Sequence, residues 1–538
     1  MCNHAHPDRP GKKLIQEDAH EAEHKMFSRR DFLHSAGLVA TGLAATIHGF
    51  PMYALGAAWQ MAPLAMAETD RVLVLIQLRG GNDGLNTVVD RFNSEYYNIR
   101  PTIAITESNL WALDQKNGMP NAMIDLQPMW EEGKMKIIHN VGYPQPNYSH
   151  FRSSDIWATA SDSREYVSSG WIGRYIDYEM PAFQEAQPTI PPALQIGVQT
   201  DLVFQGSQRN LALSISSPKE FYKLALSGQL YDVNISDSAP NNRELKFVRH
   251  VANSAFRYSQ TIRDAYNKGR NEENYPDNGL AEQLAIVAKL IKGNLGTKVY
   301  LVYIDGFDTH ANQYQNHLVL LNRISASVSA FYKDLQKQGY DDKVLGMTFS
   351  EFGRTIYENG SQGTDHGTSA PMLLFSKDIG KEIIGTAPDL MNTDQYGDPY
   401  FETDFRDVYG TVLKNWFGLP GEVADFVVGK QRPVIEGLVP VKNPPVGTED
   451  FKALLGHRKA AGSPDTIEFY YSIHHDGQVI LELTDTSGQL IRVLQDVYKQ
   501  KGSHTVEIHT KKMAIRPGEY QYRLKTGGRI FERRIFVE

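Results

Sequence analysis

Five stretches of the chain are almost wholly apolar over the length of a β-strand. They are Arg71–Leu78, Lys136–Val141, Lys298–Ile304, Val344–Phe349 and Pro371–Phe375. Apolar runs without alternation are typical of strands covered on both faces, as in a parallel sheet flanked by helices. Between two of these runs, Leu280–Lys292 repeats its apolar residues with the period of an α-helix. The alternation of strand and helix signals predicts an α/β domain.

The pattern changes in the last part of the chain. From Thr466 onward, short segments alternate apolar and polar residues and are separated by turns such as Asp476-Gly477 and Ser487-Gly488. This texture predicts a small antiparallel β-sandwich. A stretch punctuated by prolines comes before it and reads as a linker. We therefore expect an α/β domain over 70–438, a Pro-rich linker over 439–463 and the sandwich over 464–538.

Composition narrows the class of protein. The chain has 538 residues, of which 41% are hydrophobic and 22% charged, as in soluble globular proteins of more than one domain. A net charge of −8 and the absence of a long Lys/Arg run argue against a nucleic-acid partner. The single cysteine is Cys2, close to the N-terminus. Any transition-metal site must therefore use His, Asp and Glu.

The N-terminal region contains a candidate export signal. Ser28–Leu33 contains the pair Arg29-Arg30, an apolar stretch runs from Ala36 to Ile47, and Ala65-Met66-Ala67 offers small residues for cleavage. This order resembles a twin-arginine export signal, with residues 1–67 as extension and signal peptide. The apolar stretch is shorter than the roughly 20 residues that span a bilayer, so no stable membrane span is expected. The resemblance implies a twin-arginine translocase as partner and an exported protein of the periplasm or cell surface; a buried helix after two surface arginines is the alternative.

The last 75 or so residues also resemble a known module. Asp485–Leu490 and Pro517–Tyr520 are similar to the C-terminal sorting domains of the type IX secretion system. The Tyr-Pro-Asn-Pro opening of those domains is missing here. The resemblance implies type IX secretion machinery as a partner, and a carbohydrate-facing or spacer sandwich is the alternative.

Acidic and imidazole groups follow or precede three of the predicted strands. They are Asp305, Asp308 and His310 in the first segment, Glu351 with Arg354 in the second, and Asp365 with His366 in the third. Residues just past the carboxyl ends of strands form the ligand crevice of an α/β sheet. Carboxylates and neutral imidazoles can together hold a divalent metal such as zinc, manganese or calcium. Taken singly, an Asp after a strand can be a helix cap, and Glu351 with Arg354 a structural ion pair.

These segments resemble the alkaline phosphatase superfamily, which includes sulfatases and cofactor-independent phosphosugar mutases. In the mutases a strand is followed by Asp, four residues and His, as in Asp305 and His310; His366 with the nearby Pro371 fits their last metal-binding His. Where the family has an Asp-His pair, this chain has Ser350-Glu351. The resemblance implies a three-layer α/β/α alkaline phosphatase-like core.

The same resemblance assigns roles near the first strand and the first helix. The superfamily places a metal-binding Asp directly after strand one, whereas here Asp83 follows the glycines of the loop that begins at Arg79. That glycine loop could bring N–H groups and Arg79 to an oxyanion, or be a structural turn. The superfamily's nucleophile has its best counterpart in Ser149, which would also cap a helix.

More closely, Val72 to about Leu438 resembles a family of twin-arginine-exported bacterial proteins of unassigned function that is distantly related to the sulfatases. The phrases that carry this resemblance are Gly80–Gly84, Ser149–Ser153, Gly170–Arg174, Asp308–His310, Ser350–Thr355 and Asp365–Gly367. Two functions follow. The first is an extracytoplasmic, metal-dependent hydrolase of anionic phosphate or sulfate esters, in which Ser149 attacks, Arg79 or Arg354 stabilises charge, and His150 or His366 handles protons or metal. The second is a non-catalytic binding or scaffolding module on a decayed site.

Overall fold

The computed structural model describes most of the chain after residue 70. The described residues are 45–47, 50–52, 70–179, 190–197, 201–206, 211–215, 256, 258–441, 454–459, 465–473, 477–485, 489–500, 502–526 and 529–537. They belong to two compact units. The first contains residues 1–163, 167–408 and 435–440, and the second contains 164–166, 409–434 and 441–538.

A nine-stranded sheet forms the centre of the first unit. Its path is β15-β7-β14-β11-β3-β10-β8-β9, and β16 pairs with β7 outside this path. The strands are β3 (Val72–Arg79), β7 (Met135–Gly142), β8 (Ala193–Ile196), β9 (Ala212–Ile215), β10 (Val299–Asp305), β11 (Val344–Phe349), β14 (Ala370–Phe375), β15 (Glu382–Ile384) and β16 (Thr403–Asp404). All neighbours are parallel except that β14 runs antiparallel to both β11 and β7. Each of the five apolar runs forms a strand of this sheet.

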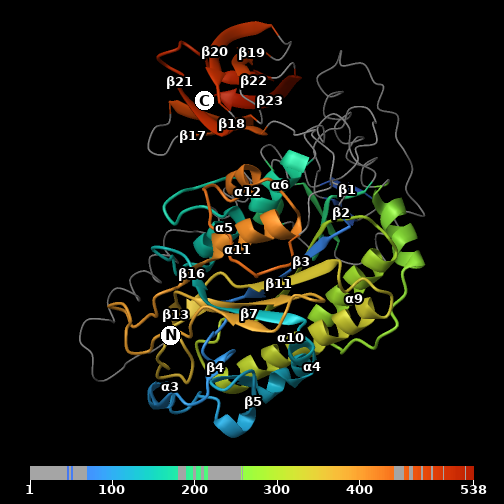
Figure 1. The fold of residues 1–538 in the computed structure, drawn as a ribbon, viewed down its shortest axis with the longest axis vertical. Coiled ribbons are helices and arrows are strands. Elements are labelled where there is room, and N and C mark those ends of the chain that lie inside the picture. The colour runs from blue at the N-terminus through green and yellow to red at the C-terminus, as the bar shows by residue number, and fades with distance from the viewer. Residues whose placement is uncertain are drawn as a thin grey trace. The chain divides into compact units, whose positions relative to one another are not determined.

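Helices cover both faces of the sheet, as Figure 1 shows. One layer contains α5 (His150–Thr159) and α6 (Trp171–Glu179); the other contains α4 (Gln127–Glu131), α9 (Gly279–Lys292) and α10 (Gln313–Gln336). The predicted helix is α9, whose Leu284 and Val287 are fully buried in the main core with residues of β3 and β10. On the other face, Trp157 of α5 stacks on Phe349 of β11. The expected three-layer α/β class is thereby confirmed.

Smaller elements lie around the sheet. They are β4 (Val89–Asp90), α3 (Ser94–Ile99), η1 (Glu107–Asn109), β5 (Leu110–Ala112), β6 (Asn117–Pro120), η2 (Asn121–Leu126), η3 (Leu202–Phe204), β12 (Gly353–Arg354), β13 (His366–Gly367) and α11 (Phe405–Thr411). Of these, β12 and β13 form a two-stranded antiparallel pair in which Arg354 lies opposite His366. This pair places Arg354 and His366, both selected by sequence analysis, next to each other.

The second unit contains the predicted antiparallel sandwich. Its two sheets have the orders β17-β18-β21 and β20-β19-β22-β23 and share one buried apolar core. The elements are η4 (Val412–Trp416), α12 (Gly421–Val427), β17 (Leu454–Lys459), β18 (Thr466–Ile473), β19 (Gly477–Thr484), β20 (Leu490–Lys499), β21 (Gly502–His509), β22 (Gly518–Thr526) and β23 (Arg529–Val537). Strand β17 lies within the range expected as linker. It begins after Pro445, the last proline of that range, and pairs with β18. Its Leu455 is part of the apolar core of the sandwich, which is why this segment belongs to the sheet.

Little of the N-terminal region is described. The arginine pair and the expected cleavage site lie outside the described residues, whereas β1 (Ala45–Ile47) and β2 (Phe50–Met52) form a short antiparallel hairpin. The last three residues of the apolar stretch expected in the export signal thus form a strand. Among the described residues, no helix combines the length and apolar character needed to cross a bilayer.

Candidate metal centre

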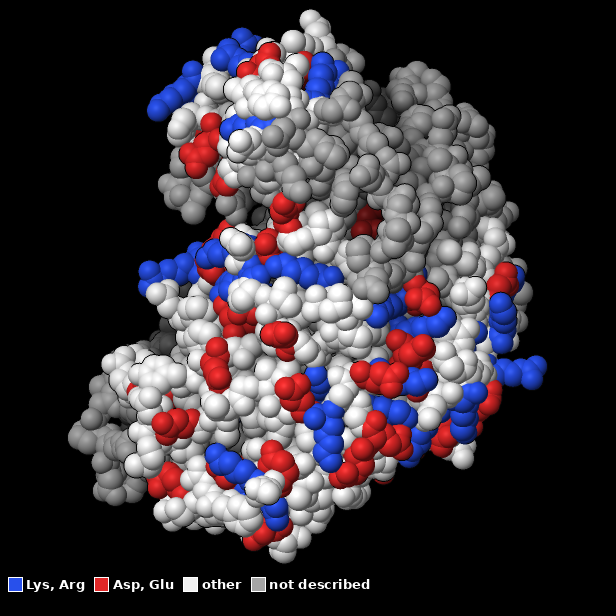
Figure 2. Space-filling view, in the orientation of Figure 1, with Lys and Arg blue, Asp and Glu red and all other residues white. Residues whose placement is uncertain are grey.

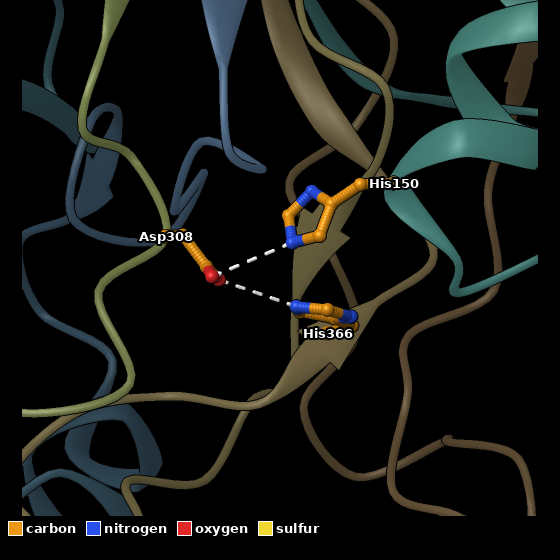
Figure 3. Close-up of side chains that lie close together, drawn as sticks. All are labelled: His150, Asp308 and His366. Carbon is orange, nitrogen blue, oxygen red and sulfur yellow. Dashed lines mark hydrogen bonds and ion pairs between the residues drawn. The ribbon is translucent and has the colours of Figure 1, made fainter. Parts of the chain in front are cut away.

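Three segments far apart in the sequence bring His150, Asp308 and His366 together, as Figure 3 shows. His150 is the first residue of α5, Asp308 lies in the loop after β10, and His366 begins β13. One ligand atom from each lies within 4.8 Å of the others, close enough for one metal ion to be held between them. Asp308 and His366 are two of the residues that sequence analysis offered as metal ligands, and His150 is one that it offered for handling protons or metal.

His310 joins this group from the same loop as Asp308. Its Nε2 lies 3.1 Å from Oδ1 of Asp308 and 3.0 Å from Nε2 of His366. Nε2 of His366 is 3.2 Å from the same Asp308 oxygen, and Nε2 of His150 is 3.5 Å from Oδ2. Three imidazole Nε2 atoms thus converge on one carboxylate. We call His150, Asp308, His310 and His366 the histidine-aspartate cluster.

The opposite nitrogen of each ring is held by an oxygen acceptor. Nδ1 of His150 lies 2.9 Å from Oε1 of Glu351, and Nδ1 of His310 lies 3.3 Å from Oδ1 of Asp365. Nδ1 of His366 donates to the backbone carbonyl of Tyr148 at 2.7 Å. A proton on Nδ1 leaves the Nε2 lone pair free to bind a cation, and such outer hydrogen bonds orient the histidine ligands of metal proteins. The arrangement of all three rings fits that pattern.

Without a cation, protons must compensate for the close approach of these groups. Burial opposes charge on Asp308, but hydrogen bonds from His150, His310 and Arg354 outweigh it and hold the pKa of the carboxyl far below its ordinary range. Burial also lowers the pKa of His150, yet hydrogen bonds to Asp308 and Glu351 raise it overall to about 9. His150 is therefore protonated at neutral pH in the metal-free protein. A metal ion would replace this proton.

The other two rings respond in opposite directions. The pKa of His310 is raised, because hydrogen bonds to Asp308 and Asp365 outweigh its desolvation. The pKa of His366 is lowered, first by burial and then by the charges of Arg354 and the neighbouring histidines. A neutral His366 with Nδ1 protonated presents its Nε2 lone pair to the centre of the cluster, which is the form that binds metal.

Glu351 and Asp365 lie outside the converging atoms. Sequence analysis offered both as metal ligands, but the structure places each against Nδ1 of a histidine. Glu351 is buried, and its Oε1 also accepts from the backbone N–H of Gly80 at 2.8 Å. This carboxylate therefore orients His150 and ties the glycine loop after β3 to the cluster.

Arg354 is fully buried behind the cluster. Its guanidinium donates to Asp308 at 2.7 Å and to the backbone carbonyls of Gly81, Thr364 and Phe307, as well as to that of Gly80. These bonds fix three loops and keep Asp308 ionised. They also leave the side chain no surface for a substrate.

Two residues assigned to the site by sequence analysis pair with each other elsewhere. Arg79 lies 3.8 Å from Asp305 and stacks over the ring of Tyr303. The side chain of Asp305 is 65% exposed. The sequence pattern could not separate Asp305 from Asp308, because both follow the same strand and differ only in how the loop turns.

Asp83 is buried in a different set of contacts. Its Oδ2 forms an ion pair with Arg100 at 2.6 Å, and both side chains are essentially inaccessible. Burial raises the pKa of Asp83, but the neighbouring charges of Arg100 and His317 overcome this and lower it overall. The displaced position of Asp83 after the glycines thus leads it beneath the site instead of into the cluster.

Ser149 lies between two residues that contact the cluster. It is the N-cap of α5, and its Oγ accepts from the backbone N–H of Arg152 at 3.5 Å. Tyr148, just before it, supplies the carbonyl that orients His366. Sequence reasoning did not find Tyr148, because a backbone carbonyl leaves no signal in the residue type. Phe352, whose ring packs at 4.9 Å from His150 and 4.4 Å from His366, was also missed.

Comparison with solved structures found similar chains, three of which follow. A protein in the alkaline phosphatase superfamily from Vibrio parahaemolyticus has 11% identity and a TM-score of 0.30, covering 84% of this chain and 85% of its own. The PsFucS1 sulfatase from Pseudoalteromonas sp. has 10% identity and a TM-score of 0.32, with coverage of 82% and 85%. The alkaline phosphatase from the Antarctic bacterium TAB5 has 9% identity and a TM-score of 0.24, with coverage of 59% and 94%.

No curated protein matches the sequence. The whole histidine-aspartate cluster lies within residues 133–376, which run from just before β7 to just after β14. These residues match a family described as a protein of unknown function (DUF1501).

Proposed function

We propose that this protein is a metal-dependent hydrolase of phosphate or sulfate esters. The observation that carries the proposal is the orientation of the three histidines, each with Nδ1 held by an oxygen and Nε2 turned toward Asp308. This donor set fits one metal ion, which would be held by His150, His310, His366 and Asp308. A metal bound there supplies a Lewis acid that neutralises charge on the ester oxygens.

The donor set narrows the metal. Imidazole nitrogens suit zinc and other transition metals, whereas calcium takes six to eight oxygen ligands. Here three of the four converging side chains are imidazoles, and the carboxylates of Glu351 and Asp365 face away from the centre. Zinc is therefore favoured over calcium, and manganese, which prefers oxygen ligands, is the less favoured transition metal.

The chain's own residues have separable roles in this proposal. Glu351 holds the ring of His150, and Arg354 holds Asp308 as a carboxylate. Ser149, at the start of α5 and next to His150, attacks the ester as nucleophile. Since Arg354 is buried, its guanidinium does not reach the substrate, and a metal held by the histidine-aspartate cluster would supply the positive charge there.

A non-catalytic metal-binding module is the second candidate. The observation that favours it is that both arginines proposed to stabilise an oxyanion are engaged with protein groups. Arg354 donates to several protein acceptors, and Arg79 contacts Asp305 and Tyr303. Both candidates bind metal. They differ in whether Ser149 does chemistry.

The first test measures metal in the full-length protein purified without chelators. We expect about one zinc or manganese per chain, and loss of most of it in His366→Ala, because a missing ligand typically weakens a protein metal site severely. His504→Ala in the sandwich is the control, since Nε2 of His504 contacts only the carbonyl of Gln500 among its described partners. A chain without metal, or a His366→Ala variant with full metal content, would refute the site.

The second test separates the two candidates with Ser149→Ala. If Ser149 is the nucleophile, hydrolysis of p-nitrophenyl phosphate or sulfate disappears while metal content stays. If it only caps α5, stability falls by about 1 kcal/mol and activity is retained. Asn93→Ala is the matched control, because Asn93 caps α3 by a bond to the N–H of Glu95.

We further propose that the protein works outside the cytoplasm, in the periplasm or at the cell surface, after export by the twin-arginine translocase. The support is the Arg29-Arg30 pair before an apolar stretch. The sandwich is proposed to engage type IX secretion machinery. Replacing both arginines with lysine should leave unprocessed precursor in the cytoplasm, since the receptor reads guanidinium groups. Unchanged processing would count against this location.

A further inference from the structure

The side-chain amide of Gln313 joins three loops beneath the histidine-aspartate cluster. Gln313 begins α10 and is fully buried. Its Oε1 accepts from the hydroxyl of Thr309 at 2.9 Å and from that of Thr364 at 2.6 Å, and its Nε2 donates to Oδ2 of Asp83. Thr309 lies between Asp308 and His310 in the sequence. One amide thus contacts the loop after β10, the loop before β13 and the loop after β3.

The two threonines are close to every metal-binding residue of their loops. Thr364 lies two residues before His366, and its backbone N–H donates to the carbonyl of Thr309 at 3.2 Å. Nε2 of His310 lies 3.0 Å from Nε2 of His366, so the two rings face a common centre. The spacing of these two loops therefore decides whether the nitrogens can share one ion.

The orientation of the amide is determined by its surroundings. Asp83 faces Nε2 and forms a buried ion pair with Arg100, so this carboxylate is ionised and can only accept. The NH₂ group must point toward Asp83, and the carbonyl oxygen must point toward the two threonine hydroxyls. An amide satisfies both sides at once, whereas neither a carboxylate nor an apolar side chain can.

We propose that Gln313 is a positioning residue that sets the distance between the two loops bearing His310 and His366. The inference rests on the proposed metal site and adds a residue to it that touches no ligand atom. Outer contacts of this kind change metal affinity by about 10- to 100-fold when they are removed. The effect of losing Gln313 belongs at the lower end, because it acts through the threonines.

The experiment uses the full-length protein and Gln313→Glu, which keeps the shape of the side chain. The new carboxylate faces Asp83 with like charge and donates nothing to it, so we expect the zinc Kd to rise about tenfold. The zinc Kd is measured by chelator competition, well below the melting temperature of each variant, so that loss of stability alone does not move it.

Thr364→Val provides a second variant that removes only one hydroxyl donor to Gln313. It should also raise the zinc Kd, and it decides the question if Gln313→Glu does not fold. Ser327→Ala is the control, since it removes a buried hydroxyl of α10 that contacts Asn278 instead. An unchanged Kd in folded Gln313→Glu, or in Thr364→Val, would overturn the inference while the metal site stands. Failure of the wild-type chain to bind zinc or manganese would overturn both.

Discussion

At the scale of single residues, the candidate centre depends on which ring nitrogen each histidine presents. Glu351, Asp365 and the carbonyl of Tyr148 hold the three Nδ1 atoms. The three Nε2 atoms then face the ionised carboxylate of Asp308, which favours a proton on a ring nitrogen next to it. A metal ion bound there would displace protons from the ring nitrogens, so metal binding would be linked to proton release.

This linkage gives a prediction for the metal-free protein. Hydrogen bonds raise the folded-state pKa of His150 to about 9, above its ordinary value of 6.5. A raised pKa stabilises the fold fully below the unfolded pKa, and this stability is lost as pH rises through the folded pKa. Metal-free wild type should therefore lose melting temperature between about pH 6.5 and 9 more steeply than His150→Gln.

The melting temperature of both proteins is measured in chelator across this window. His310 titrates in the same direction in both, and the lowered pKa of His366 keeps that ring neutral there. Equal pH slopes for the two proteins would contradict the assigned protonation of His150. Zinc affinity should increase over the same window, because the ion must displace the proton.

At the scale of elements, the β12–β13 pair aligns Arg354 with His366. The pair is two residues long on each side, with Gly353 opposite Gly367. A Cβ at Gly353 would lie 1.8 Å from the carbonyl oxygen of Ser369, and one at Gly367 would lie 2.3 Å from the backbone of Arg354. These distances leave no space for a side chain. The two glycines thus permit the close backbone approach that brings the guanidinium under Asp308.

Gly353→Ala should push β12 away from Ser369, just after β13, and lower both stability and zinc content. The added Cβ clashes with the backbone of Ser369, and overpacking of this kind costs about 1 to 3 kcal/mol. Thermal unfolding and metal analysis of the purified variant measure the two effects. Gly360→Ala is the control, because nothing lies within 4 Å of the added Cβ. Normal zinc content in Gly353→Ala would show that the pair does not position the cluster.

At the scale of the whole molecule, the chain forms two units that are not contiguous in sequence. Residues 435–440 belong to the first unit although 409–434 belong to the second. Within the first unit, Arg71 donates to the carbonyl of Pro440 at 3.0 Å, and Nζ of Lys136 donates to that of Gly437. Lys136 is also paired with Glu382 at 2.9 Å.

Figure 2 shows Lys/Arg and Asp/Glu intermingled over the described part of one face, without a large patch of either sign.

Truncation after Pro440 should therefore leave a more stable α/β unit than truncation after Val434. The shorter chain loses the carbonyls of Pro440 and Gly437, which accept from Arg71 and Lys136, and each lost hydrogen bond costs about 0.5 to 1.5 kcal/mol. Urea unfolding of the two truncated proteins measures the difference. Equal stability of the two truncations would remove the role assigned to 435–440.

Limited proteolysis of the full chain should also release a stable α/β fragment and a small β fragment.

The main strands of the central sheet follow from the sequence alone. Apolar runs such as Val344–Phe349 become strands because burial on both faces requires an unbroken apolar stretch, and Leu280–Lys292 becomes α9 because its period matches a helix. The short strands β8, β9, β15 and β16 of that sheet, and strands β17 and β20 of the sandwich, were not predicted. Exposed apolar residues on β20, such as Leu490 and Val493, hide the alternation that marks a half-buried strand.

The sequence also indicated that candidate ligands such as Asp308 lie in loops after strands, since parallel strands bring their carboxyl ends to one edge. Only the tertiary structure decided which of these side chains converge. Asp305 and Asp308 follow the same strand, yet one is largely exposed beside Arg79 and the other meets three histidines. Local periodicity ends where a strand ends, so the direction of a loop side chain depends on contacts from distant residues. For Asp308 that contact is Arg354, 46 positions along the chain.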